Sequence, residues 1–205
     1  MALKGKNFVV PCLALALSGC MMTPTHETVA NYAVYDMKDP QNRSPDEVGD
    51  TYLAALKTIM SDVSVTRNIP PQELPDKPGR FELVNPLQGS SLGALAAANG
   101  ASMNVPNCAG AYIIVASDDT GMSRWGENTR YYNCLWQYKD GWHIDWYISY
   151  SKKSGGVSAD AMASVLVESV MGDSRKSMTV YRDNIIKKMN DKGFTTQLIE
   201  SYPKQ

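Results

Sequence analysis

The sequence predicts an α+β fold: a small antiparallel sheet of three to five strands, with helices packed on one face and one disulfide bond. Three observations support this prediction. Residues 131–150 carry large side chains at alternate positions on either side of an Asp-Gly pair, which is typical of a β-hairpin. Residues 44–60 and 175–192 carry apolar side chains at helical spacing. Two cysteines remain beyond the N-terminal segment, and they can pair.

The N-terminal segment has the features of a bacterial export signal. Lys4 and Lys6 precede an apolar run over residues 8–17, and small residues follow it. The run is about ten residues long, whereas a membrane-spanning helix needs roughly twenty. We therefore expect residues 1–19 to be a cleaved signal peptide.

The tetrad Leu17-Ser18-Gly19-Cys20 resembles the lipobox of bacterial lipoproteins. The resemblance implies cleavage before Cys20 and attachment of lipid, including palmitate, to that residue. Met21 follows where the inner-membrane retention signal of these proteins has Asp, which favours the outer membrane with the domain facing the periplasm. The alternative is an ordinary secretory signal that happens to end in cysteine.

Residues 20–43 are polar and are interpreted as the lipidated N-terminus and a tether. Residues 44–205 then form one domain. The motif Ser44-Pro45-Asp46-Glu47 predicts the start of its first helix, with Ser44 as cap and Glu47 completing a capping box. This helix is expected to run to about Met60, and one face is formed by side chains at helical spacing: Val48, Tyr52, Leu56, Ile59 and Val63.

The middle of the chain predicts short elements joined by loops. Residues 69–79 contain four prolines and read as an extended loop, followed by a short strand over 81–84. Residues 89–98 predict a helix of small side chains. Residues 111–117 predict a central strand, and residues 118–129 a polar loop.

The hairpin predicts a particular register. A three-residue loop, Lys139-Asp140-Gly141, pairs Tyr138 with Trp142 and collects the large apolar side chains of both strands on one face. Beyond the hairpin we expect helices over residues 158–171 and 175–192. The second ends in a Schellman motif at Gly193, and residues 195–202 form an edge strand or a tail.

In an oxidising compartment Cys108 and Cys134 are expected to form a disulfide, because Cys12 leaves with the signal and Cys20 carries lipid. The bond closes a loop of 26 residues, and the chain-entropy model assigns it about 3.5 kcal/mol. Two cysteines with one nearby histidine do not complete a zinc site, so no metal is expected. The covalent lipid is the only non-protein group that the sequence implies.

Two motifs invite a catalytic interpretation. The sequence around Ser91 matches G-x-S-x-G, with Asp118, Asp119 and His143 later in the chain, but the βαβ units of hydrolases with that motif are missing. His143 and Asp145 share one face of the hairpin and could form a proton-transfer pair or half of a metal site. The alternative is a solvated sheet face with one incidental histidine. We expect no enzymatic activity.

The candidate partner-binding residues are aromatic and basic, because Trp, Tyr and Arg are enriched at binding hot spots. They are Arg124, Trp125, Arg130, Tyr131 and Tyr147. Trp125 either projects toward a partner or folds onto its own sheet. Tyr131 and Tyr147 are expected on the polar face, where rings can stack on glycans or pack across strands.

The sequence thus favours a non-enzymatic lipoprotein that docks a protein partner in an envelope assembly for secretion, conjugation, pilus formation or outer-membrane construction. A lysozyme-inhibitor-like or glycan-binding module is the alternative, with peptidoglycan as a further candidate ligand, and a Ser91 hydrolase is a third. A formal net charge of −1 gives no reason to expect binding to nucleic acid.

Overall fold

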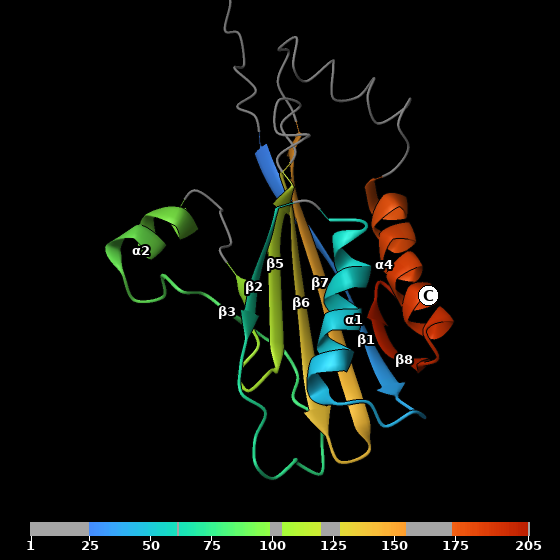
Figure 1. Cartoon of the computed structure of the whole chain (residues 1–205). Coiled ribbons are helices and arrows are strands. Elements are labelled where there is room, and N and C mark those ends of the chain that lie inside the picture. Colours follow the sequence, from blue (N-terminus) through green and yellow to red (C-terminus); the bar gives the residue numbers. More distant parts are fainter. Residues whose placement is uncertain (1–24, 61, 99–103, 120–127, 155–173, 205) are drawn as a thin grey trace, which may run out of the picture.

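The computed structural model describes residues 25–60, 62–98, 104–119, 128–154 and 174–204. Its main body is a six-stranded antiparallel sheet in the order β2-β5-β6-β7-β1-β8 (Figure 1). The strands are β1 (Thr25–Lys38), β2 (Val63–Arg67), β5 (Ile113–Asp119), β6 (Asn128–Tyr138), β7 (Gly141–Ser154) and β8 (Thr195–Tyr202). The α+β class is confirmed, but the sheet has more strands than the three to five expected.

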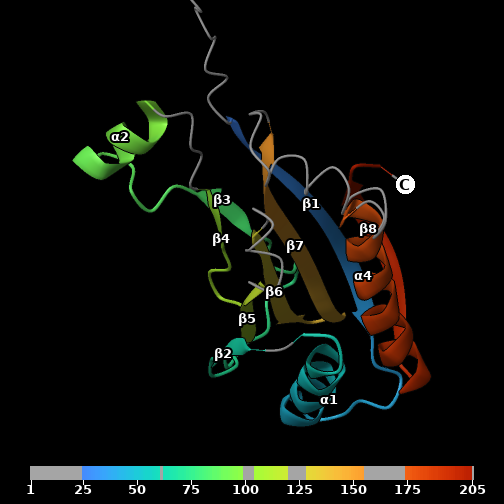
Figure 2. The ribbon, with the colours of Figure 1, turned by 90° about the horizontal axis from the view of Figure 1, so that it is seen from above.

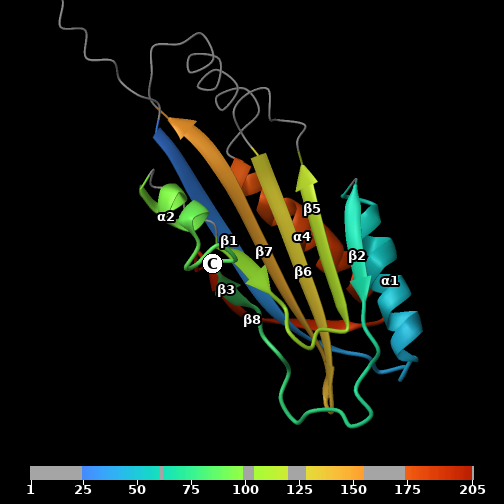
Figure 3. The same ribbon diagram turned by 90° about the vertical axis from the view of Figure 1, so that its left-hand side faces the viewer.

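Two helices, α1 (Pro45–Lys57) and α4 (Ser174–Asp191), cover one face of this sheet. Figure 3 shows both of them behind the sheet. A third helix of the described part of the chain, α2 (Ser91–Ala98), stands away from the sheet on its other side (Figure 2). It is joined to the body by a small two-stranded sheet of β3 (Glu82–Val84) and β4 (Val105–Asn107). We call β3, α2 and β4 together the arm.

The interpretation of residues 20–43 as a tether is wrong for most of that segment. β1 pairs with β7 from Thr25 to Met37 and with β8 on its other side. Consecutive residues Ala33, Val34 and Tyr35 are all buried, because both faces of the sheet are covered at this position. A strand buried on both faces loses the simple alternation of apolar and polar residues that would have identified it.

The main core lies between the sheet and the helices α1 and α4. Its buried side chains come from alternate positions of the strands and from one side of each helix. They include Tyr35, Met37, Tyr52, Leu56, Ile113, Val115, Leu135, Ile144, Trp146, Ile148, Ile185 and Met189. A second, smaller cluster lies on the opposite face and consists of Cys108, Ala111, Cys134 and Trp136. The expected disulfide between Cys108 and Cys134 is confirmed and forms part of this second cluster.

The predicted hairpin register is wrong. Tyr138 pairs with Gly141, so the loop has two residues, Lys139 and Asp140, and Cys134 lies opposite Asp145 rather than Trp146. The prediction assumed that only one face of the hairpin is buried. Trp136 and Tyr138 are in fact buried on the face opposite Trp142 and Ile144, so both faces of the hairpin hold large buried side chains.

The ends of α1 and α4 have the capping motifs that the sequence predicts. Ser44 caps α1, and both hydrogen bonds of the capping box to Glu47 are present. The C-terminal end of α4 has the predicted Schellman motif. The Phe194 N–H donates to the Met189 carbonyl, 3.2 Å, and Gly193 has a φ of +90°. The expected small-residue helix corresponds to α2, and β8 is an edge strand rather than a tail.

Three expectations fall outside the described residues: the signal peptide with Cys20, most of the loop containing Arg124 and Trp125, and the helix over 158–171. No helix in the described part of the chain is both long enough and apolar enough to cross a membrane.

The corrected register leads to a prediction at Gly141. Its φ is +147°, and a Cβ there would lie 2.7 Å from the Met37 carbonyl oxygen of the neighbouring strand. We expect Gly141→Ala to cost about 3 kcal/mol of the free energy of unfolding, measured by urea denaturation. Gly110→Ala is the matched control, because Gly110 has a φ of +76° with no atom near its would-be Cβ; we expect it to cost about 1 kcal/mol. Equal losses in the two variants would contradict the close approach of β1.

Candidate functional site

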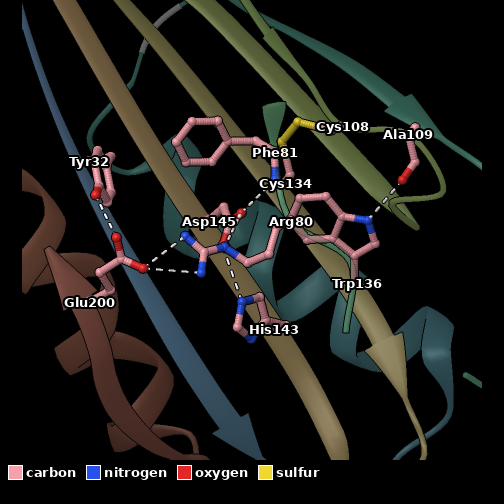
Figure 4. Close-up of polar contacts among 10 residues, drawn as sticks. All are labelled: Tyr32, Arg80, Phe81, Cys108, Ala109, Cys134, Trp136, His143, Asp145 and Glu200. Carbon is pink, nitrogen blue, oxygen red and sulfur yellow. Dashed lines mark hydrogen bonds and ion pairs between the residues drawn. A yellow bond between two sulfur atoms is a disulfide. The ribbon is translucent and has the colours of Figure 1, made fainter. Parts of the chain in front are cut away.

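A buried carboxylate marks the face of the sheet opposite α1 and α4. Along β7, Ile144, Trp146 and Ile148 belong to the main core, so the side chains that alternate with them point the other way. One of these is Asp145, whose side chain is 0% exposed. Its Oδ2 atom accepts a hydrogen bond from the backbone N–H of Phe81, 2.8 Å, and lies 3.4 Å from Nε of Arg80 (Figure 4).

Arg80 extends these contacts to the edge of the sheet. Its Nη1 and Nη2 atoms lie 3.2 and 3.3 Å from Oε2 of Glu200 on β8. The Tyr32 hydroxyl of β1 donates to the other oxygen of Glu200, 2.5 Å. Hydrogen bonding from Tyr32, and then from Arg80, lowers the pKa of the Glu200 carboxyl, while the same bond raises the pKa of Tyr32. We call Asp145, Arg80, Phe81, Glu200 and Tyr32 the base network.

His143 lies next to the base network. Its Nε2 atom is 3.3 Å from Oδ1 of Asp145, and the side chains of the two residues are 6% and 0% exposed. The prediction that they share a face is confirmed, but the interpretation of that face as solvated is wrong. The segment carrying Phe81 and the neighbouring Trp136 cover this face. The Trp136 Nε1–H donates to the Ala109 carbonyl, 3.2 Å.

The base network fastens the arm to the sheet. The first strand of the arm, β3, begins directly after Arg80 and Phe81. The last strand of the arm, β4, ends directly before Cys108. The Phe81 ring packs against the rings of Tyr32 and Tyr147, at 5.7 and 5.6 Å between centroids. The disulfide to Cys134 holds the other end. The arm is therefore attached at two points near each other on the same face of the sheet.

The arm itself is apolar and exposed. Leu83 on β3 is 48% exposed, and Leu92 and Leu95 on α2 are 58% and 61% exposed. Exposed aliphatic side chains clustered on a projecting element mark an interaction site more often than scattered ones do. The arm is thus one of two candidate binding elements of the domain; the other is the outer edge of β8.

A separate cavity of about 330 Å³ lies at the hairpin-turn end of the sheet, near Lys38, Arg43 and Tyr138. Its basic side chains already have partners. Lys38 Nζ contacts the Tyr138 hydroxyl, 2.8 Å, and Asp36, 3.2 Å, and these contacts raise the pKa of Lys38. Arg43 pairs with Asp39, 2.7 Å. Among the residues that the structure describes, no group of three or more potential metal ligands was found.

The predicted binding residues do not form one surface. Arg124 and Trp125 lie outside the described residues. Arg130 is exposed and pairs with Asp118, 3.1 Å. Tyr131 and Tyr147 are 6% and 5% exposed, so the expectation that both rings lie on an accessible polar face is wrong. Tyr131 belongs to the main core, whereas Tyr147 packs under Phe81 on the opposite face.

The surroundings of Ser91 differ from a nucleophile elbow. Residues 85–90 form turns between β3 and α2, so Ser91 does not stand on a tight strand-to-helix connection. Asp118 lies on β5, and His143 is buried beside Asp145. The G-x-S-x-G match therefore marks the start of an exposed helix.

The sequence prediction missed Arg80 and Glu200, because only folding brings together residues so far apart along the chain. One signal was available: no Asp, Glu, Lys, Arg or His occurs between Glu82 and Asp118, although charged residues make up 20% of the chain. That uncharged stretch includes α2, β4 and most of β5. No protein-family model, curated protein or solved structure matches this chain.

Removing the buried carboxylate tests the base network. We expect Asp145→Ala to lower the free energy of unfolding by about 3 kcal/mol, because it leaves the buried Phe81 N–H and the Nε atom of Arg80 without their partner. Asp145→Asn keeps an acceptor for Phe81 and should cost less. Asp76→Ala is the control, because Asp76 and its partner Lys139 are 82% and 59% exposed; an exposed pair contributes less than about 1 kcal/mol. Equal costs for Asp145→Ala and Asp76→Ala would count against the network.

Acidification tests the Glu200 contacts separately. The pKa of Glu200 is lower in the folded protein than its ordinary value of 4.5. The contacts of the carboxylate therefore stabilise the fold above pH 4.5, and this stabilisation is lost as the pH falls through the lowered pKa. We expect Glu200→Gln to weaken the loss of stability on acidification, measured by urea denaturation between pH 3 and pH 7. Tyr32→Phe should weaken it in part. Unchanged profiles in both variants would contradict the assignment.

Proposed function

We propose that this protein is a lipoprotein of the outer membrane, anchored through Cys20, that acts without catalysis as a docking component of an envelope assembly for secretion, conjugation, pilus formation or outer-membrane construction. The lipobox-like tetrad supports the anchor. The outer edge of β8 supports the docking role, and it is the observation on which the proposal rests.

A lipid on Cys20 would hold the domain close to the membrane, because β1 begins shortly after that residue. Thr25, the first residue of β1, comes five residues after Cys20. A fully extended chain spans at most about 3.6 Å per residue, so the start of β1 lies within about 18 Å of the lipidated residue. This short distance supports a domain held close to the anchored leaflet rather than one carried on a long tether.

β8 presents a preformed edge for another strand. It is the last strand of the six-stranded sheet, and its exposed side chains include Leu198, Ile199 and Tyr202, at 40%, 52% and 60%. An edge strand offers backbone N–H and C=O groups to an added strand, and apolar side chains beside the edge add specificity.

The base network holds this edge in place before any partner arrives. Glu200 of β8 contacts Arg80 and Tyr32, so side chains of β1 and of the segment before β3 help to hold the strand. A preformed edge lowers the entropy cost of binding. We infer that the partner is an envelope protein that adds an extended segment, with apolar side chains at alternate positions, as a seventh strand.

The test is photo-crosslinking in living cells, with a photoreactive residue at position 199 and, as a control, at position 180 of α4. Val180 is 54% exposed and Ile199 is 52% exposed, so the two positions are equally accessible. We expect position 199 to capture one envelope protein through a defined segment. A peptide of that segment should slow amide hydrogen exchange in β8. Ile199→Asp should weaken its binding at least tenfold, whereas Val180→Asp should leave it unchanged.

Two results would contradict the proposal. If the Cys20→Ala protein still fractionates with the outer membrane, the lipid anchor is wrong. If the anchored protein captures no envelope protein from position 199, or if the captured segment leaves exchange in β8 unchanged, the docking role of this edge is wrong.

A further inference from the structure

The arm differs in chemistry from the rest of the protein. The chain has 20 basic and 21 acidic residues, but none of them lies between Glu82 and Asp118. The arm's helix α2 reads Ser-Leu-Gly-Ala-Leu-Ala-Ala-Ala, and all its described residues except Gly93 are exposed. A soluble domain gains nothing from exposing a helix of this composition to water, because apolar surface is stabilised by leaving water.

The segment before α2 holds the helix in one conformation. The Ser90 hydroxyl donates to the Leu87 carbonyl, 2.7 Å, and accepts from the Gly93 N–H, 3.0 Å. A Cβ at Gly93 would lie 2.1 Å from the Leu87 carbonyl oxygen, so glycine is needed for this close approach. The turn therefore packs against Gly93, and Leu92 and Leu95 are left on the exposed surface of the helix.

The arm also lies near the anchored end of the molecule. α2 stands beside the sheet toward the end at which β1 begins, and Figures 1 and 3 agree on this placement. That end lies within about 18 Å of Cys20 along the chain. An exposed apolar helix close to a lipid-modified residue has a bilayer surface within reach.

We propose that α2 binds the membrane surface, with Leu92 and Leu95 entering the interfacial region of the leaflet that holds the Cys20 lipid. This proposal rests on the lipid anchor of the proposed function and is independent of the β8 edge. The helix has eight residues, far fewer than the roughly twenty that span a bilayer, so it lies on the membrane surface. The lipid anchor keeps it at high local concentration, so a weak contact is enough.

The absence of charge favours a lipid surface over a protein partner. Protein interfaces carry a polar rim around their apolar centre, whereas the stretch from Leu83 to Ser117 has no charged side chain with which to form ion pairs. The same feature predicts how binding depends on conditions. Because α2 has no basic residue to attract anionic headgroups, its contact should be insensitive to anionic lipid and to salt.

The experiment uses the acylated mature protein with a photoreactive residue at position 92 or 95, reconstituted in phosphatidylcholine vesicles. Matched vesicles contain one-third phosphatidylglycerol, and each set is measured at 50 and 500 mM salt. Position 69 is the control. Ile69 is 93% exposed and follows the end of β2, which pairs with the start of β5 at the opposite end of the sheet. Mass spectrometry measures lipid adducts, and the same three proteins are irradiated in cells to detect protein adducts.

We expect lipid adducts at positions 92 and 95 at least fivefold above those at position 69, with less than a twofold change between vesicle types or salt concentrations. Adduct levels equal to those at position 69 would overturn the proposal, and so would capture of a protein from positions 92 and 95 in cells. These outcomes are separate from failure of the lipid anchor, because an anchor failure appears as loss of the wild-type protein from the membrane fraction before any irradiation.

Discussion

The position of the arm depends on the contacts that the buried Asp145 carboxylate makes with Phe81 and Arg80. A buried charge costs several kcal/mol in lost hydration unless it is paired and hydrogen-bonded. The Oδ2 atom of Asp145 has such partners in the Phe81 N–H and the Arg80 guanidinium, both supplied by the segment that leads into the arm. The sheet therefore cannot bury this side chain without also fixing where the arm begins.

The same contacts connect the two candidate binding elements. Arg80, at the base of the arm, contacts Asp145 in the interior of the sheet and Glu200 on its edge strand, so one guanidinium connects the arm to both β7 and β8. The disulfide secures the end of the arm with Cys134, which lies directly opposite Asp145 in the β6–β7 register. One small region thus holds an apolar helix on one side and a sheet edge on the other. This arrangement is compatible with the proposed role, in which the protein holds a partner next to a membrane.

Features set by neighbouring residues could be predicted from the sequence, and features set by distant residues could not. The cap at Ser44, the Schellman motif at Gly193 and the disulfide were predicted because each depends on a short motif or on the number of cysteines. The hairpin register was missed because both faces of β6 and β7 are buried. Trp136 and Trp142 are equally buried on opposite faces, so collecting the large side chains on one face does not identify the register. β1 was missed for the same reason.

The candidate site illustrates this limit. The sequence placed His143 and Asp145 on one face, because strand alternation is a local rule, but it could not identify the segment that covers them. Arg80, Phe81 and Glu200 reach Asp145 only through the path of the chain over the sheet. The uncharged stretch after Glu82 was visible in the sequence. That part of it forms an exposed, projecting helix, α2, could be learned only from the structure.

The most direct test of this account is hydrogen exchange at the Phe81 amide, followed by NMR in the oxidised wild-type protein. If the Asp145 carboxylate holds the base of the arm, this amide exchanges as slowly as the amide of Ile144 in the core of β7. An amide that exchanges at the rate of an exposed loop, while Ile144 stays protected, would mean that the segment is not fixed by Asp145 and would contradict the central claim.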